Sequence, residues 1–111
     1  MKAAVIHELG DENVFRYEEV PEPMPRPRQV VIQVKAASIN RGDLDRRQGT
    51  YPFPAKLPLV IGWDVAGTVV AVGSQVSERH VGQRVIAAMP QGGYAEKAVA
   101  SVGATVPLPD N

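Results

Sequence analysis

The side chains that could do chemistry in this sequence are few, and none of them is a thiol. The chain has 111 residues and no cysteine, which excludes disulfides, thiolate catalysis and a cysteine-based zinc site. The two histidines, His7 and His80, have no third metal ligand near them in the sequence, and we assign them no role. Tyr51 is a different kind of candidate, because a phenol is protonated at neutral pH and can donate a proton or a hydrogen bond.

Four more residues are candidates, three before Tyr51 and one after it. Each of them also has a purely structural interpretation. Asn40 could be the N-cap of a helix that follows it. Asp43 and Arg47 are four residues apart, which favours a surface ion pair, although Arg47 could otherwise approach a phosphate. Trp63 could belong to the core or could present a flat apolar wall to an aromatic ligand.

The elements that must position these residues are short. The clearest strand is residues 29–37, where apolar and polar side chains alternate, so we expect one buried and one exposed face. Residues 42–48 have a helical pattern that begins after Asn40 and ends at Gly49. Residues 51–60 are rich in proline and form an irregular loop, in which Tyr51 could simply pack as a lid.

Other segments complete a mainly β chain. Strands are predicted at residues 3–8, 15–20, 65–73, 82–87 and 94–100, with a hairpin joining the first two and a turn at 89–93 before the last. Gly67 interrupts an otherwise apolar strand, which indicates a central strand with a bend or a close backbone approach. About six or seven short strands with one short helix are typical of a barrel or sandwich and exclude a parallel βαβ sheet.

Composition limits the classes of partner. The 12 basic residues equal the 12 acidic residues, which argues against binding to nucleic acid or to an anionic membrane surface. No stretch approaches the roughly 18 apolar residues of a membrane span, and the first residues lack the pattern of a signal peptide. We therefore expect a cytoplasmic protein with a single domain at residues 1–111.

Several motifs occur together in one order along nearly the whole chain. They are MKAAV at 1–5, VVIQVKAASIN at 30–40, GTYP at 49–52, GWDVAG at 62–67, VGQRV at 81–85, GGYAE at 92–96 and VPLP at 106–109. This order resembles the GroES-like amino-terminal domain of the medium-chain dehydrogenase/reductase superfamily, in its zinc-free quinone oxidoreductase (zeta-crystallin) branch. The resemblance implies a partly open β-barrel with one or two short helices. Family members pair this barrel with a Rossmann domain, whose Gly-x-Gly-x-x-Gly fingerprint this chain lacks.

The resemblance also implies roles for the candidate residues. Zinc-dependent relatives have a cysteine and a histidine where this chain has Asn40 and Trp63, so we predict no metal. The implied reaction is hydride transfer from NADPH to a quinone or an α,β-unsaturated carbonyl (an enone). Tyr51 matches a tyrosine that borders the cleft and is assigned as proton donor in enoyl reductase relatives, while Asn40 matches an asparagine near the nicotinamide ribose or substrate. Asp43 and Trp63 are expected in the same cleft.

Two functions remain open from the sequence. The first is the substrate-side domain of an NADPH-dependent quinone or enone oxidoreductase, which we expect to be inactive without the Rossmann domain. The second is a stand-alone binding or assembly module, because GroES-like barrels also occur without dehydrogenase chemistry. In either case a surface normally covered by a partner domain could form a homo-oligomer.

Overall fold

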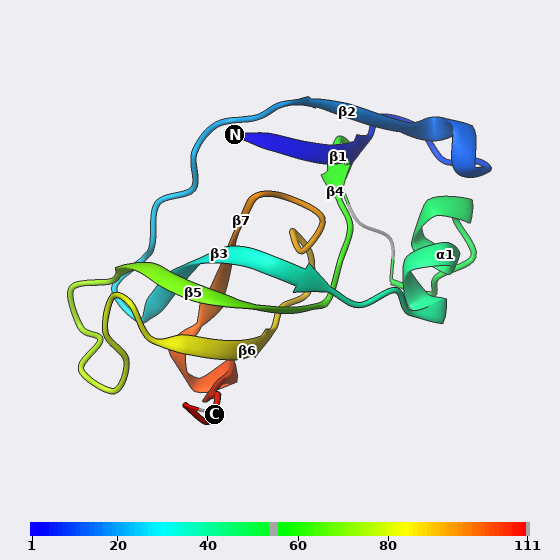
Figure 1. The fold of residues 1–111 in the computed structure, drawn as a ribbon. Coiled ribbons are helices and arrows are strands. Elements are labelled where there is room, and N and C mark those ends of the chain that lie inside the picture. Colours follow the sequence, from blue (N-terminus) through cyan, green and yellow to red (C-terminus); the bar gives the residue numbers. More distant parts are fainter. Residues whose placement is uncertain (54–55, 111) are drawn as a thin grey trace.

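The computed structural model describes residues 1–53 and 56–110, which fold into antiparallel sheets with one α-helix (Figure 1). The strands are β1 (Lys2–Ile6), β2 (Phe15–Glu19), β3 (Gln29–Ala37), β4 (Leu59–Val60), β5 (Asp64–Val72), β6 (Arg84–Ala88), β7 (Lys97–Ser101) and β8 (Thr105–Pro107). The helix is α1 (Arg41–Gln48), and two short 3-10 helices are η1 (Glu12–Val14) and η2 (Val102–Ala104). No helix among the described residues is long and apolar enough to cross a membrane.

The strands form two sheets. A three-stranded sheet has the order β2-β1-β4, and a five-stranded sheet has the order β7-β3-β5-β6-β8. Every pair in both sheets is antiparallel, and the larger sheet curls around its own inner face (Figure 1). This architecture confirms the predicted mainly β fold, a partly open barrel with a short helix.

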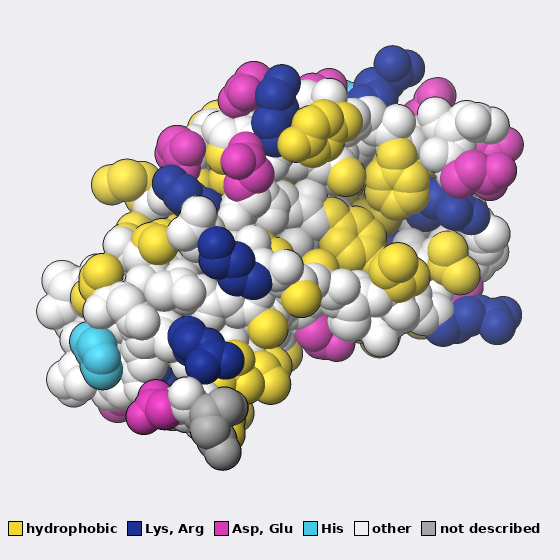
Figure 2. Space-filling model, viewed as in Figure 1, with side chains coloured by type: hydrophobic (Ala, Val, Ile, Leu, Met, Phe, Trp, Pro, Cys, Tyr) yellow, Lys and Arg dark blue, Asp and Glu magenta, His cyan; other side chains and the backbone are white. Residues whose placement is uncertain are grey.

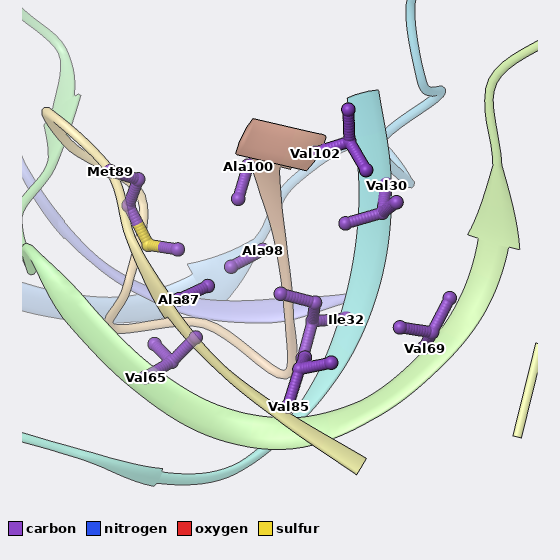
Figure 3. Packing of buried hydrophobic residues seen from close by; sticks show 10 residues of the cluster. All are labelled: Val30, Ile32, Val65, Val69, Val85, Ala87, Met89, Ala98, Ala100 and Val102. Carbon is purple, nitrogen blue, oxygen red and sulfur yellow. The ribbon is translucent and has the colours of Figure 1, made fainter. Parts of the chain in front are cut away.

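The inner face of the five-stranded sheet holds the main core (Figure 3). Branched side chains predominate there because they fit the pleated surface of a sheet with little loss of rotamer freedom. The cluster contains Val30, Ile32, Val65, Val69, Val85, Ala87, Met89, Ala98, Ala100 and Val102. A second cluster, Ile6, Val14, Leu59 and Ile61, lies by the smaller sheet, with Leu57 and Tyr94 packed against it.

The predicted alternation of β3 holds only in part. Val30 and Ile32 are buried as expected, but Val31 is buried as well and Ala36 is exposed. The register between β3 and β5 shifts between Val31 and Ile32 and again between Val34 and Ala36. Each irregularity changes which face the following side chains occupy, so a strict period of two cannot persist along the strand.

Sequence patterns missed two strands, and they did not show which strands pair around the turn at residues 89–93. The strands β4 and β8 have two and three residues, and both lie in proline-containing sequence that does not suggest a strand. The strands on either side of the 89–93 turn do not pair with each other, because β6 pairs with β5 and β8 whereas β7 pairs with β3. Residues 54 and 55 of the predicted proline loop lie outside the described residues.

The pairing of β3 with β5 positions the segment that leads to the candidate site. Opposite the middle of β3, Gly67 lies so near that strand that a Cβ atom there would be 2.0 Å from the carbonyl oxygen of Gln33. The prediction of a close backbone approach at Gly67 is therefore confirmed. Past the last paired residues, the backbone N–H of Ser38 donates to the carbonyl of Asp64 at 3.2 Å. The segment before α1 is thus held beside the start of β5.

Candidate functional site

Helix α1 ends at the predicted residue and begins one residue earlier than predicted. Asn40 has extended backbone angles at the N-cap, and its N–H donates to the Asp43 carboxylate at 2.9 Å. Gly49 ends the helix with φ 86°, in the left-handed region that glycine adopts without steric cost. The helix starts at Arg41, one residue before the predicted start.

The Asn40 side chain points toward the start of β5. Its amide nitrogen donates to Ser38 Oγ at 3.0 Å and to Asp64 Oδ2 at 3.3 Å. Ser38 Oγ in turn donates to the same Asp64 oxygen at 2.8 Å. Asn40 therefore occupies the predicted N-cap, and its side chain belongs to a polar network beside Trp63. Its contact with a ribose or substrate stays a prediction.

Trp63 lies against the first turn of α1. A Cβ atom at Gly42 would be 2.2 Å from Cη2 of the indole, so the ring can lie here only because residue 42 is glycine. Trp63 is half-buried and belongs to neither hydrophobic cluster. Its indole Nε1 is buried and has no hydrogen-bond partner among the described residues. Trp63 is therefore not a member of either core cluster, and its role as the wall of a site stays a prediction.

Tyr51, Trp63 and Arg46 form a stacked group. The rings of Tyr51 and Trp63 meet edge to face, with centroids 5.4 Å apart and planes at 63°. The Arg46 guanidinium carbon lies 4.9 Å from the Tyr51 centroid and 5.2 Å from that of Trp63, within the range of cation–π attraction. Phe53 adds a third ring 5.9 Å from Tyr51. Sequence reasoning had placed Tyr51 and Trp63 in one site but had missed Arg46.

A cavity of about 80 Å³ opens beside this group. Its lining is apolar except for Arg46 and the polar atoms of Tyr51, and consists of Leu9, Arg46, Gly49, Tyr51, Phe53, Leu57 and Leu59. The Tyr51 hydroxyl makes no hydrogen bond to any residue that the structure describes, so its proton is available to a ligand. A donor in an apolar cavity next to a cation can stabilise negative charge that develops on a bound oxygen.

Asp43 does not form the predicted ion pair with Arg47. It is only 3% exposed, and its Oδ2 atom accepts a hydrogen bond from the Tyr94 hydroxyl at 2.7 Å as well as the one from Asn40. The reason is that Asp43 lies in the first turn of α1 and turns inward, where a carboxylate is favoured by the free N–H groups of the helix. Its other oxygen, Oδ1, is buried without a partner among the described residues.

Tyr94 is the second functional candidate that sequence reasoning missed. Burial raises the pKa of its hydroxyl, and the hydrogen bond to Asp43 together with the charges of Asp43 and Asp64 raises it further. Tyr94 therefore stays protonated and acts as a fixed donor to Asp43. Tyr94 belongs to the motif GGYAE, which could have marked it as a candidate. The motif does not indicate that Asp43 is its hydrogen-bond partner.

Removing this donor should destabilise the fold. We expect Tyr94→Phe to lower the free energy of unfolding by about 1–3 kcal/mol, because one of the two donors to a buried carboxylate oxygen is lost. Urea unfolding measures the change. Tyr17→Phe is the matched control, since Tyr17 is 74% exposed and its hydroxyl makes no hydrogen bond among the described residues. Equal stability of the two variants would contradict this account of Tyr94.

An apolar pocket of about 430 Å³ lies on the other side of α1. It is lined by Phe15, Ala37, Ile39, Asp43, Leu44, Arg47 and Tyr94. Figure 2 shows hydrophobic side chains gathered on the face between β2 and α1. Ile39 is 82% exposed, which is unusual for a large aliphatic side chain and indicates a surface that can be covered by another element.

No group of three or more His, Cys, Asp or Glu side chains converges as a metal site within residues 1–53 and 56–110. Of the two positions that hold zinc ligands in zinc-dependent relatives, Asn40 bonds to Ser38 and Asp64, and Trp63 lies against Gly42. An amide and an indole are poor zinc ligands. The prediction that the site uses no metal therefore continues to rest on residue type.

Comparison with known proteins agrees with the fold. Residues 26–110 match the alcohol dehydrogenase GroES-like domain. Quinone oxidoreductase from Lama guanicoe is 39% identical over 111 residues, which cover 98% of this chain and 34% of that protein. The chain therefore spans about a third of the length of the relatives it matches.

Solved structures share the fold closely. Escherichia coli quinone oxidoreductase, solved in complex with NADPH, superposes with a TM-score of 0.93 at 30% identity, covering 98% of this chain and 33% of that one. The human synaptic vesicle membrane protein VAT-1 homolog-like protein gives a TM-score of 0.96 at 34% identity, covering 99% and 35%. The chain belongs to the alcohol dehydrogenase GroES-like domain family, and the relatives it resembles include quinone oxidoreductases.

Proposed function

We propose that this chain is the acceptor-side domain of an NADPH-dependent quinone or enone oxidoreductase that transfers hydride without zinc. The observation that carries the proposal is the Tyr51 hydroxyl, which has no protein partner among the described residues and stands beside an apolar cavity and the Arg46 charge. Relatives named quinone oxidoreductase align with nearly the whole chain, which supports the same reaction class.

Each site residue has a part in this proposal. Tyr51 donates a proton or hydrogen bond to the acceptor oxygen as negative charge develops on it. Trp63 supplies a flat surface on which an aromatic or quinoid acceptor can lie. Asn40 supplies an amide at the edge of that surface, where it can hydrogen-bond to the cofactor ribose or the acceptor. Asp43 acts indirectly, because its bonds to Asn40 and Tyr94 hold the first turn of α1 in place.

The residues present fit one side of a nicotinamide cofactor. The half-buried Trp63 indole offers a flat face, and the adjacent Asn40 amide offers a polar group beside it. NADPH supplies the hydride in this reaction class, and two of the similar solved structures are complexes with it. We assign most of its binding to the nucleotide-binding domain of the whole protein.

That domain would cover part of the surface described above. We propose residues 1–111 as one domain and place the Rossmann domain in the two thirds of its relatives' length that the chain does not span. The exposed apolar pocket between β2 and α1 is a suitable contact surface for it. A stand-alone binding or assembly module is the alternative, in which this pocket would hold a second copy of the chain.

The test compares the 111-residue chain with a longer protein that includes the nucleotide-binding domain. We expect the longer protein to oxidise NADPH only when a quinone or enone is added, and the 111-residue chain to show no turnover. The oligomeric state of the chain, measured by light scattering, tests the alternative in the same samples. A stable dimer together with no acceptor-dependent oxidation by the longer protein would favour the binding module over the reductase.

A further inference from the structure

The charge of Arg46 has no counterion in the part of the chain that the structure describes. Within residues 1–53 and 56–110, no carboxylate lies within ion-pair distance of its guanidinium, whereas Arg28 pairs with Glu78 elsewhere on the surface. Its only hydrogen bond among these residues runs from Nη1 to the carbonyl oxygen of Pro90. Its Nε is buried and has no partner there. Most donors of this side chain are therefore not used by the described protein.

The surroundings of Arg46 strengthen the attraction of its charge for an anion. The guanidinium lies against the rings of Tyr51 and Trp63, and it lines the same apolar cavity as Tyr51. Aromatic faces on a half-buried guanidinium exclude water from it, and a charge that is poorly hydrated attracts a counterion more strongly. The stacking also holds the planar group in one orientation, which reduces the entropy lost when a ligand binds.

We infer that Arg46 determines acceptor specificity by binding an anionic group, a carboxylate, on the molecule that is reduced. The guanidinium can form a charge-assisted pair with a carboxylate through Nη2 and the second hydrogen of Nη1, because Nε is buried and the other Nη1 hydrogen is donated to the Pro90 carbonyl. The carboxylate would lie in the cavity beside Arg46, and the rest of the acceptor, with its reducible carbonyl, would extend past Tyr51 toward the open side, because about 80 Å³ holds the anionic group and not the whole acceptor. This inference rests on the proposed function, because it names the class of acceptor for the same cavity.

The two aromatic rings beside Arg46 are placed by contacts that do not involve its charge, and its one hydrogen bond among the described residues goes to a backbone carbonyl. Trp63 is already placed by its contact with Gly42, and Tyr51 touches both Trp63 and Phe53. A neutral side chain of similar length could fill the space beside the two rings. What a neutral side chain would lose is the attraction for negative charge in the cavity, and this attraction is what the experiment must measure.

Two small probes isolate the charge. Benzoate and benzamide have the same ring and nearly the same shape, but only benzoate is an anion at neutral pH. Trp63 is the single tryptophan of the chain, so its indole N–H gives one NMR resonance that reports directly on the site. Titration of the 111-residue chain with each probe, without cofactor, gives two dissociation constants. We expect benzoate to bind about tenfold more tightly, as one charge-assisted hydrogen bond would give.

Variants then assign the preference to Arg46. In Arg46→Gln we expect the two dissociation constants to become equal within about twofold, and in Arg46→Lys we expect a reduced preference for benzoate, because the charge remains but the planar fork is lost. Arg41→Gln is the matched control, since Arg41 is an exposed arginine of the same helix and does not line the cavity. This variant should keep the full preference.

Three results would overturn the inference. They are equal affinities of the unaltered chain for the two probes, no binding of either probe, and a benzoate preference that persists in Arg46→Gln. The Arg46→Lys variant and the comparison in the unaltered chain decide the matter even if Arg46→Gln does not fold. Failure of the reductase proposal looks different, because it would appear as absent NADPH oxidation in the longer protein, whatever the probes show.

Discussion

Replacement of Tyr51 by phenylalanine is expected to lower kcat for quinone or enone reduction by about 10²–10⁴-fold, the usual contribution of a positioned proton donor. The substitution keeps the ring, so its edge-to-face contact with Trp63 and its stacking on Arg46 should persist. Only the hydroxyl is lost, and that group makes no hydrogen bond to the described protein. The KM for the acceptor should therefore change much less than kcat.

The measurement is steady-state NADPH oxidation by the longer protein with its nucleotide-binding domain. Tyr17→Phe serves as the control, because Tyr17 is an exposed residue of β2 and does not line the cavity. Thermal unfolding of both variants shows whether the fold is intact. Unchanged kcat in Tyr51→Phe would remove Tyr51 from the role of proton donor and leave it as a wall of the cavity.

The second large effect concerns stability. Gly67→Ala should lower the free energy of unfolding by about 3 kcal/mol, near the upper end of the usual cost of overpacking. The added methyl would lie 2.0 Å from the Gln33 carbonyl oxygen in the neighbouring strand. A backbone carbonyl in a paired central strand cannot rotate away as a side chain can, so β3 and β5 would have to separate locally.

Gly103→Ala is the matched control for Gly67→Ala. Gly103 lies in η2, and a Cβ atom there would meet no atom within 4 Å. We expect its stability to remain within about 0.5 kcal/mol of the unaltered chain, as for most surface substitutions. Urea unfolding followed by Trp63 fluorescence measures both variants. If Gly67→Ala is as stable as Gly103→Ala, the close approach of β5 to β3 does not constrain residue 67.

The pairing of β3 with β5, which requires glycine at residue 67, also determines the positions of site residues. The segment after β3 leads to Asn40, and β5 begins immediately after Trp63, so the register of this pair decides where the two residues lie relative to each other. A change at Gly67 should therefore alter the emission of Trp63 even in molecules that remain folded.

Local patterns in the sequence were sufficient for most elements. The helix was placed by the sequence between its N-cap Asn40 and its terminal Gly49, and its observed start differs by one residue. The first hairpin and the central strand with Gly67 were also predicted correctly. The short strands β4 and β8 were missed because two or three residues next to prolines have no period to recognise. They are strands only because β1 and β6 pair with them.

The residues of the candidate site were also predicted only in part. Tyr51 and Trp63 were named from their motifs, and the structure brings their rings together. Asp43 was taken for a partner of Arg47 because helix spacing allows that pair, whereas the structure turns it toward Tyr94, 51 positions along the chain. Arg46 differs from Arg47 by one helix position, and the sequence alone does not say which of them faces the aromatic rings.

Residue types by themselves determined that this protein is a mainly β domain without thiol chemistry. Those properties depend on composition and on patterns within about ten residues. Only the tertiary structure decided that Arg46 stacks on both rings without a counterion among the described residues, and that Asp43 is buried against Tyr94. Both contacts join helix α1 to residues outside it, and the curvature and register of the sheets determine which of those residues it meets.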